Sequence, residues 1–250
     1  MRWLHISDLH FGYENNEIDT MRRELLRQLA PRIKPIDCIF ITGDFRYAPT
    51  YKTDFPSEVL TYVQDLQNAL GVSPENTFVA QGNHDLNRGE GNSYPKMIET
   101  ARNAYQTSNG EFDPFVLRNV ETMREPYKEL YEAIRGRPEP ERWHYCEERN
   151  GYNIICLNTA IFSCRDKEDG ELILGSNLMD EMFRREVNPN LPSIVLAHHD
   201  LEALHPTERR KFKNKLKSLY ERGSWRLDED KPNVINLSKL WRERRNGKRN

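Results

Sequence analysis

The chain has 250 residues, of which 37% are hydrophobic and 30% charged, and it is long enough to form one large α/β domain with a proper core. Its 37 Lys and Arg residues nearly balance its 39 Asp and Glu residues, which excludes a global electrostatic field that recruits nucleic acid or an anionic membrane. No stretch approaches the roughly 18 uncharged residues of a membrane span, so we expect a soluble protein that is not exported.

The first part of the sequence predicts three strands that alternate with two helices. Short apolar runs predict strands at residues 2–6, 37–42 and 77–80, and apolar residues at helical spacing predict helices at 18–33 and 56–70. This alternation is typical of parallel strands joined by right-handed crossovers.

A polar stretch then interrupts the alternating pattern. We interpret residues 86–145 as a helical insertion beside the site, with helices at 97–105 and 120–134. Strands are expected again at 152–157 and 193–197.

The last part of the chain is more basic. Apolar positions predict a helix at 176–187, and a basic helix follows at 207–222. We therefore divide the chain into a main domain over residues 1–206 and a basic helix with an atypical tail over 207–250.

The four cysteines contain no CxxC pair. Cys38 and Cys156 lie inside apolar runs that are typical of buried strands. We expect all four to be reduced and inert, as is usual for a cytoplasmic protein.

Four of the predicted strands end in polar residues that can bind metals. Ligands bind beyond the carboxyl ends of the strands in such sheets, so clusters that are distant in sequence should meet there. Their carboxylate, amide and imidazole groups, with no thiolate, suit Mn, Fe or Zn. The candidates are Asp8 and His10, Asp44, Asn83 and His84, and His198.

The motifs Asp8-x-His10, Gly43-Asp44, Gly82-Asn83-His84-Asp85 and a strand-terminal His198 stand in the order and spacing of one known family. About the first 200 residues resemble the calcineurin-like metallophosphoesterases. The resemblance implies a four-layer α/β/β/α sandwich with two divalent metal ions, Mn first and Fe or Zn as alternatives. It also implies hydrolysis of phosphomonoesters or phosphodiesters, with a nucleotide or nucleic-acid diester among the candidate substrates.

The resemblance assigns metal-binding roles by position. Asp8 and His10 would hold the first metal, Asp44 would bridge both metals, and Asn83 and His198 would hold the second. The attacking group would be a hydroxide that the metals generate near neutral pH.

The same resemblance places His84 on the substrate rather than on a metal. His84 would stabilise the phosphate or protonate the leaving oxygen, and Asp85 could orient its imidazole by a hydrogen bond. We count both as catalytic residues.

One departure from the family's pattern opens an alternative function. The family normally ends its site with Gly-His-x-His, which supplies one ligand to each metal, and no such sequence follows Asp200. The segment 221–250 also lacks the apolar strand that should precede the motif. The alternative is a degenerate module that binds a partner or a nucleotide with little or no turnover.

Several neighbouring residues admit two interpretations. His198 directly follows an apolar run and is favoured over His199 as the ligand, and His205 favours a surface or capping role. Arg46 either contacts a substrate phosphate or is an exposed loop residue.

Two further groups bear on nucleic-acid binding. The basic run from Arg209 to Lys217 favours a packed helix with a solvated face over a nucleic-acid contact. Trp143 and Tyr145 could either stack on a base or pack in the core.

Overall fold

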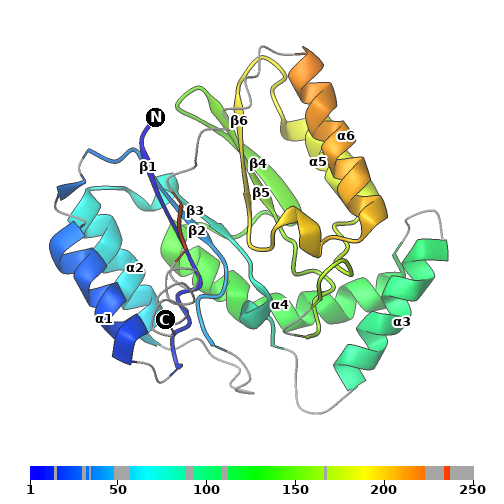
Figure 1. The fold of residues 1–250 in the computed structure, drawn as a ribbon, viewed down its shortest axis with the longest axis horizontal. Coiled ribbons are helices and arrows are strands. Elements are labelled where there is room, and N and C mark those ends of the chain that lie inside the picture. Colours follow the sequence, from blue (N-terminus) through cyan, green and yellow to red (C-terminus); the bar gives the residue numbers. More distant parts are fainter. Residues whose placement is uncertain are drawn as a thin grey trace, which may run out of the picture.

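The computed structural model describes residues 1–13, 16–29, 32–33, 35–47, 57–87, 93–107, 112–165, 168–222 and 234–236. Within these residues the chain forms two sheets, one of four strands and one of three, with helices around them (Figure 1).

The first sheet is parallel throughout and has the order β3-β2-β1-β7. Its strands are β1 (Trp3–Ser7), β2 (Cys38–Thr42), β3 (Thr77–Ala80) and β7 (Val234–Asn236). Both β2 and β3 are buried along their whole length, as a strand covered on both faces must be. The three strands predicted for the first part of the chain are thereby confirmed.

Two helices lie beside the first sheet (Figure 1). Helix α1 spans Asn16–Glu24 and continues as a π-helical turn over Leu25–Leu29, so the predicted helix at 18–33 is shorter than expected. Helix α2 spans Ser57–Leu70 and buries its predicted apolar face, including Val59 and Val63, in the main core.

The second sheet has the order β4-β5-β6. Strand β4 (His144–Arg149) is antiparallel to β5 (Tyr152–Leu157), which is parallel to β6 (Ser193–Ala197). We did not predict β4, because its charged second half carries no strand pattern. The Asn150-Gly151 pair could have indicated the hairpin, because Asn-Gly is typical of a two-residue turn. In the structure both residues have the positive φ that such a turn requires.

Helices α5 (Ser176–Glu186) and α6 (Pro206–Arg222) accompany the second sheet (Figure 1). Phe212 of α6 is buried in the same cluster as Met179 and Phe183 of α5. The basic helix is therefore packed, as predicted.

The insertion contributes to the core instead of standing apart from it. It contains α3 (Ser93–Thr107) and α4 (Pro114–Arg135), both longer than predicted. Asp113 caps α4 by accepting a hydrogen bond from the Phe115 amide, and Gly136 ends it in the left-handed conformation. Tyr127 and Tyr131 of α4 belong to the main cluster.

Strand β7 corrects one expectation about the tail. We expected no apolar strand there, yet β7 pairs with β1 and places Asn236 level with Ser7. Three residues are too short for a periodic pattern to show. The division of the chain at residue 206 remains a prediction.

The two sheets and their helices confirm the predicted α/β class. The four-layer order remains an expectation from the family. Over the residues that the structure describes, no helix has the length and apolarity to cross a membrane.

Candidate metal centre

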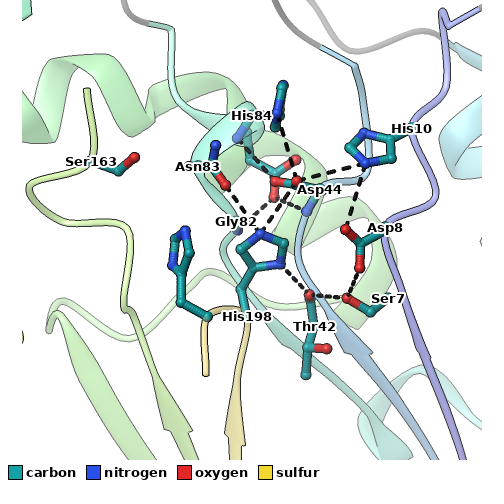
Figure 2. A network of polar contacts seen from close by, with 12 residues as sticks. Ser7, Asp8, His10, Thr42, Asp44, Gly82, Asn83, His84, Ser163 and His198 are labelled. Atoms are coloured by element: carbon teal, nitrogen blue, oxygen red, sulfur yellow. Dashed lines mark hydrogen bonds and ion pairs between the residues drawn. The ribbon is translucent and has the colours of Figure 1, made fainter. Parts of the chain in front are cut away.

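The predicted ligands meet at one edge of the first sheet. Figure 2 shows Asp44 at the centre, with Asp8 and His10 on one side and Asn83 and His198 on the other. The strands β1, β2, β3 and β6 deliver these residues at their carboxyl ends, as the parallel arrangement predicts.

Backbone hydrogen bonds join the loops that follow β1 and β2. The amides of Asp8 and His10 donate to the carbonyls of Gly43 and Asp44, at 3.1 and 2.9 Å. Asp8, His10 and Asp44 all have left-handed φ, between 47° and 58°. Such conformations are uncommon outside glycine and concentrate at functional sites, where the surrounding bonds hold them.

Two glycines allow these loops to approach each other. A Cβ at Gly82 would lie 2.2 Å from Oδ1 of Asp44, and a Cβ at Gly43 would lie 2.5 Å from the Gly82 nitrogen. Gly43 also has a φ of +75°. Close contact between the two loops therefore requires the glycine in each motif.

Asp44 presents a single carboxylate oxygen to the centre of the site. Its Oδ1 accepts a hydrogen bond from the His84 amide at 3.0 Å. Its Oδ2 lies 3.9 Å from Nε2 of His10, 3.9 Å from Nε2 of His84 and 3.3 Å from Nε2 of His198. Burial opposes ionisation, but the three histidines outweigh it and hold the pKa of Asp44 well below its usual range.

On the first side, Asp8 and His10 face each other with Oδ1 and Nε2 3.6 Å apart. Ser7 donates a hydrogen bond of 2.6 Å to the other oxygen of Asp8 and orients the carboxylate. Burial raises the pKa of Asp8, but His10 and His198 outweigh this and lower it.

On the second side, His198 is oriented by the backbone. Because a carbonyl can only accept, Nδ1 of His198 donates to the Thr42 carbonyl at 2.8 Å, which leaves Nε2 facing Asp44 and Oδ1 of Asn83. Burial lowers the pKa of His198, but Asp44 and Asp8 outweigh it and raise it to about 10. A proton, or a cation in its place, is therefore strongly favoured at Nε2.

These residues fit divalent cations. Ligand atoms of Asp8, Asp44 and His198 all lie within 4.8 Å of one another. The distances of 3.9 and 3.3 Å from Oδ2 of Asp44 to Nε2 of His10 and of His198 are long for hydrogen bonds. They are close to the about 3.4 Å between ligand atoms that share one tetrahedral ion at about 2.1 Å. Nδ1 of His10 is buried without a hydrogen-bond partner.

Comparison with known proteins agrees with this geometry. The family model of calcineurin-like phosphoesterases matches residues 1–235. The chain belongs to this family. It is 26% identical over 223 residues to the uncharacterized metallophosphoesterase-like protein YydB of Bacillus subtilis strain 168. That alignment covers 85% of this chain and 45% of the relative, so the chain spans less than half of that relative's length.

Asp85 does not have the environment we predicted. Its two carboxylate oxygens accept the backbone amides of Asp44, Phe45 and Gly82 at 3.0, 2.9 and 2.8 Å. The predicted hydrogen bond to the His84 imidazole is replaced by these three bonds. Asp85 therefore joins the loop that follows β2 to the loop that follows β3. We interpret its place in the Gly-Asn-His-Asp motif as structural.

His84 lies where a substrate contact is expected. Its ring stacks against Tyr47, with centroids 5.5 Å apart and planes inclined by 18°. Its carbonyl accepts a 3.1 Å hydrogen bond from Nε of Arg46. Because Arg46 is only 2% exposed, the interpretation as an exposed loop residue is wrong, and its contact with a phosphate remains a prediction.

His198 rather than His199 belongs to the ligand cluster, as favoured. Nδ1 of His199 is bonded to the Thr159 hydroxyl at 2.8 Å, and burial and the adjacent His198 lower its pKa to about 3. His205 accepts the Thr207 amide at 3.3 Å at the start of α6, which confirms its capping role.

The aromatic residues of the insertion pack in the core. The Arg124 guanidinium lies over the Trp143 ring, 4.7 Å from its centroid, and Tyr145 is 5% exposed and donates to the Val79 carbonyl at 3.0 Å. Base stacking by these two residues is therefore not supported.

Two buried arginines that support the metal-binding loops were missed. Arg22 of α1 donates to the Leu9 carbonyl at 2.5 Å, and Arg124 of α4 donates to Oε1 of Gln81 at 2.8 Å. Arginine is usually exposed, so its pattern carries no signal of such a role.

The other histidines of the chain lie outside the cluster of Asp8, Asp44 and His198. All seven histidines of the sequence lie in described residues. His5 contacts the Thr42 hydroxyl at 2.8 Å, and His144 is bonded to the Leu174 carbonyl and the Asn158 amide. His199 and His205 are likewise bonded through Nδ1, and none of these four histidines belongs to the cluster of candidate ligand atoms.

Proposed function

We propose that this chain hydrolyses phosphomonoesters or phosphodiesters with two divalent cations bound around Asp44. The observation that carries the proposal is Oδ2 of Asp44, which faces three imidazoles and shares the cluster of Asp8 and His198. An oxygen in that position can contact two cations at once, as a clamp on a phosphoryl group requires.

The chain's own residues then have distinct tasks. Asp8 and His10 would hold one cation, Asn83 and His198 the other, and Asp44 both. The cations, when bound, supply Lewis acidity to the phosphoryl oxygens and lower the pKa of water.

His84 is proposed to act on the substrate. Its imidazole faces the centre from a third direction, stacked on Tyr47 and bonded to Asp44 through its amide. From there, Nε2 would donate a proton to the leaving oxygen or a hydrogen bond to the phosphate.

Mn is the expected metal, with Fe or Zn as alternatives. The ligand set contains oxygen and imidazole donors, which Mn, Fe and Zn all accept. The buried cysteines lie elsewhere, and burial raises the pKa of Cys156 to about 12, so thiolate ligation is not favoured.

A second candidate is a module that binds a phosphate ester without turnover. The observation that favours it is that no Gly-His-x-His sequence follows Asp200, so the assigned residues give each cation three protein ligands. Three ligands still suffice for a catalytic ion that needs open positions. We therefore place hydrolysis first.

Two measurements on one preparation separate these functions. Metal content per chain and release of nitrophenol from bis-(p-nitrophenyl) phosphate with added Mn²⁺ should both be high for the wild type. Asp44→Asn, purified in parallel, controls for contaminating phosphatases. Metal binding without nitrophenol release, on this and on a monoester substrate, would favour the binding module.

A further inference from the structure

A row of aromatic rings leads away from the metal centre. Tyr47 stacks on His84 and lies edge-on to His10, with a centroid distance of 5.8 Å. Tyr13 is the next ring, 4.5 Å from Tyr47 and inclined by 48°. Tyr13 is 37% exposed, an unusual position for a large ring in this chain.

Both tyrosines are held by the loops that carry the metal ligands. The Tyr13 amide donates to the His10 carbonyl at 3.2 Å, and the Tyr47 amide donates to the Phe11 carbonyl at 2.8 Å. Phe11 in turn donates to the Phe45 carbonyl at 3.0 Å. These backbone bonds hold the segments that carry the two rings against the loops of His10 and Asp44.

The position of the row relative to His84 indicates what it contacts. If His84 protonates the leaving oxygen, the group attached to that oxygen extends past His84 toward Tyr47 and Tyr13. A flat ring on that group can stack on Tyr13, because every nucleobase presents a π-face that an aromatic side chain accepts. An aliphatic leaving group gains no stacking there.

We propose that Tyr13 and Tyr47 form a leaving-group subsite that selects phosphate esters bearing a nucleobase. The proposal rests on the proposed hydrolysis and narrows its substrate class. The stacking of one base corresponds to a preference of about 5- to 150-fold over a substrate that lacks it. Tyr47 is also a positioning residue for His84, so Tyr13, whose described ring contact is with Tyr47, is the cleaner site to change.

Matched substrates test the subsite directly. Adenosine 2′,3′-cyclic phosphate and ribose 2′,3′-cyclic phosphate share the scissile bond and differ in the base, and AMP and ribose 5-phosphate form the corresponding monoester pair. We expect kcat/KM to be at least about 5-fold higher for the base-bearing member, mainly through KM. In Tyr13→Ala this ratio should fall toward one, and in Tyr13→Phe it should persist.

Phe115→Ala is the matched control, because Phe115 is a 60% exposed ring at the start of α4 and is not part of the row. It should leave the ratio unchanged. A wild-type ratio near one, or a ratio that survives in Tyr13→Ala, overturns the subsite while leaving hydrolysis established.

A binding measurement separates the subsite from catalysis. Fluorescence of 2-aminopurine riboside 5′-phosphate should be quenched on titration with the wild type in EDTA, and quenching should weaken at least about 5-fold in Tyr13→Ala. If no substrate is hydrolysed but this difference is seen, the subsite stands and the proposed hydrolysis fails. Equal quenching by both proteins overturns the subsite.

Discussion

The two halves of the candidate metal centre are held in different ways. Asp8, His10 and Asp44 follow neighbouring strands of one sheet, and backbone hydrogen bonds join their loops directly. His198 comes from the other sheet and reaches this half through its side chain, bonded to the Thr42 carbonyl. Neighbouring strands thus position ligands through the backbone, whereas a facing sheet depends on single side chains.

The same difference determines which half better tolerates the loss of the C-terminal motif. The first half keeps its geometry through four backbone hydrogen bonds between its two loops and through Asp85. The second half depends on fewer contacts. We expect preorganisation to make the first cation the more tightly bound one.

Asp44→Asn should have the largest effect, because this residue joins the two halves. An amide oxygen carries no full charge and cannot serve two cations, so metal content and activity should both fall to the level of EDTA-treated protein. Metal analysis and nitrophenol release check this. Asp65→Asn, an exposed change on α2, is the control. Full occupancy by two ions in Asp44→Asn would contradict the bridging role.

His84→Ala should lower turnover by ~10²–10⁴-fold and leave both halves loaded with metal, because His84 acts on substrate. The loss should be smaller for a nitrophenol ester than for an alkyl ester, since a good leaving group needs less protonation. His205→Ala, which changes a histidine outside the centre, should retain activity. Loss of metal in His84→Ala would instead make His84 a ligand.

Measured metal affinities allow the two halves to be compared directly. Both cations should bind weakly relative to a site with the full family motif, because loss of even indirect support commonly costs ~10 to 100-fold in affinity. Dialysed protein should therefore need added Mn²⁺ well above trace levels for activity. In a calorimetric titration, His198→Ala should weaken the second binding event and His10→Ala the first. A dialysed sample with two tightly held ions and maximal activity would contradict this expectation.

Asp85→Asn should have the smallest effect on the chemistry and a measurable one on stability. One side-chain oxygen would replace two, so at least one of the three buried amides would lose its acceptor, at about 1–3 kcal/mol. Urea unfolding of the metal-free protein measures this. Asp180→Asn, at an exposed ion pair with Lys215, should change the free energy of unfolding by less than about 0.5 kcal/mol. Equal stability of the two variants would show that Asp85 does not support the loops.

The sequence predicted most of the fold because its apolar periodicity is strong. The strands at 77–80, 152–157 and 193–197 match β3, β5 and β6 to the residue. Strand β4 and strand β7 were missed because a charged edge strand and a three-residue strand lack enough apolar positions to show a period.

The sequence by itself predicted which residues meet at the candidate metal centre, because strand-terminal Asp, Asn and His residues come together wherever parallel strands end together. Only the tertiary structure decided what each neighbour does. The amides of Asp44 and Phe45 that Asp85 accepts and the carbonyl that Arg46 contacts lie 38 or more positions away in the sequence. Tyr13 reaches His84 through Tyr47. Such contacts depend on how loops distant in sequence pack together, and no local pattern of residues encodes that packing.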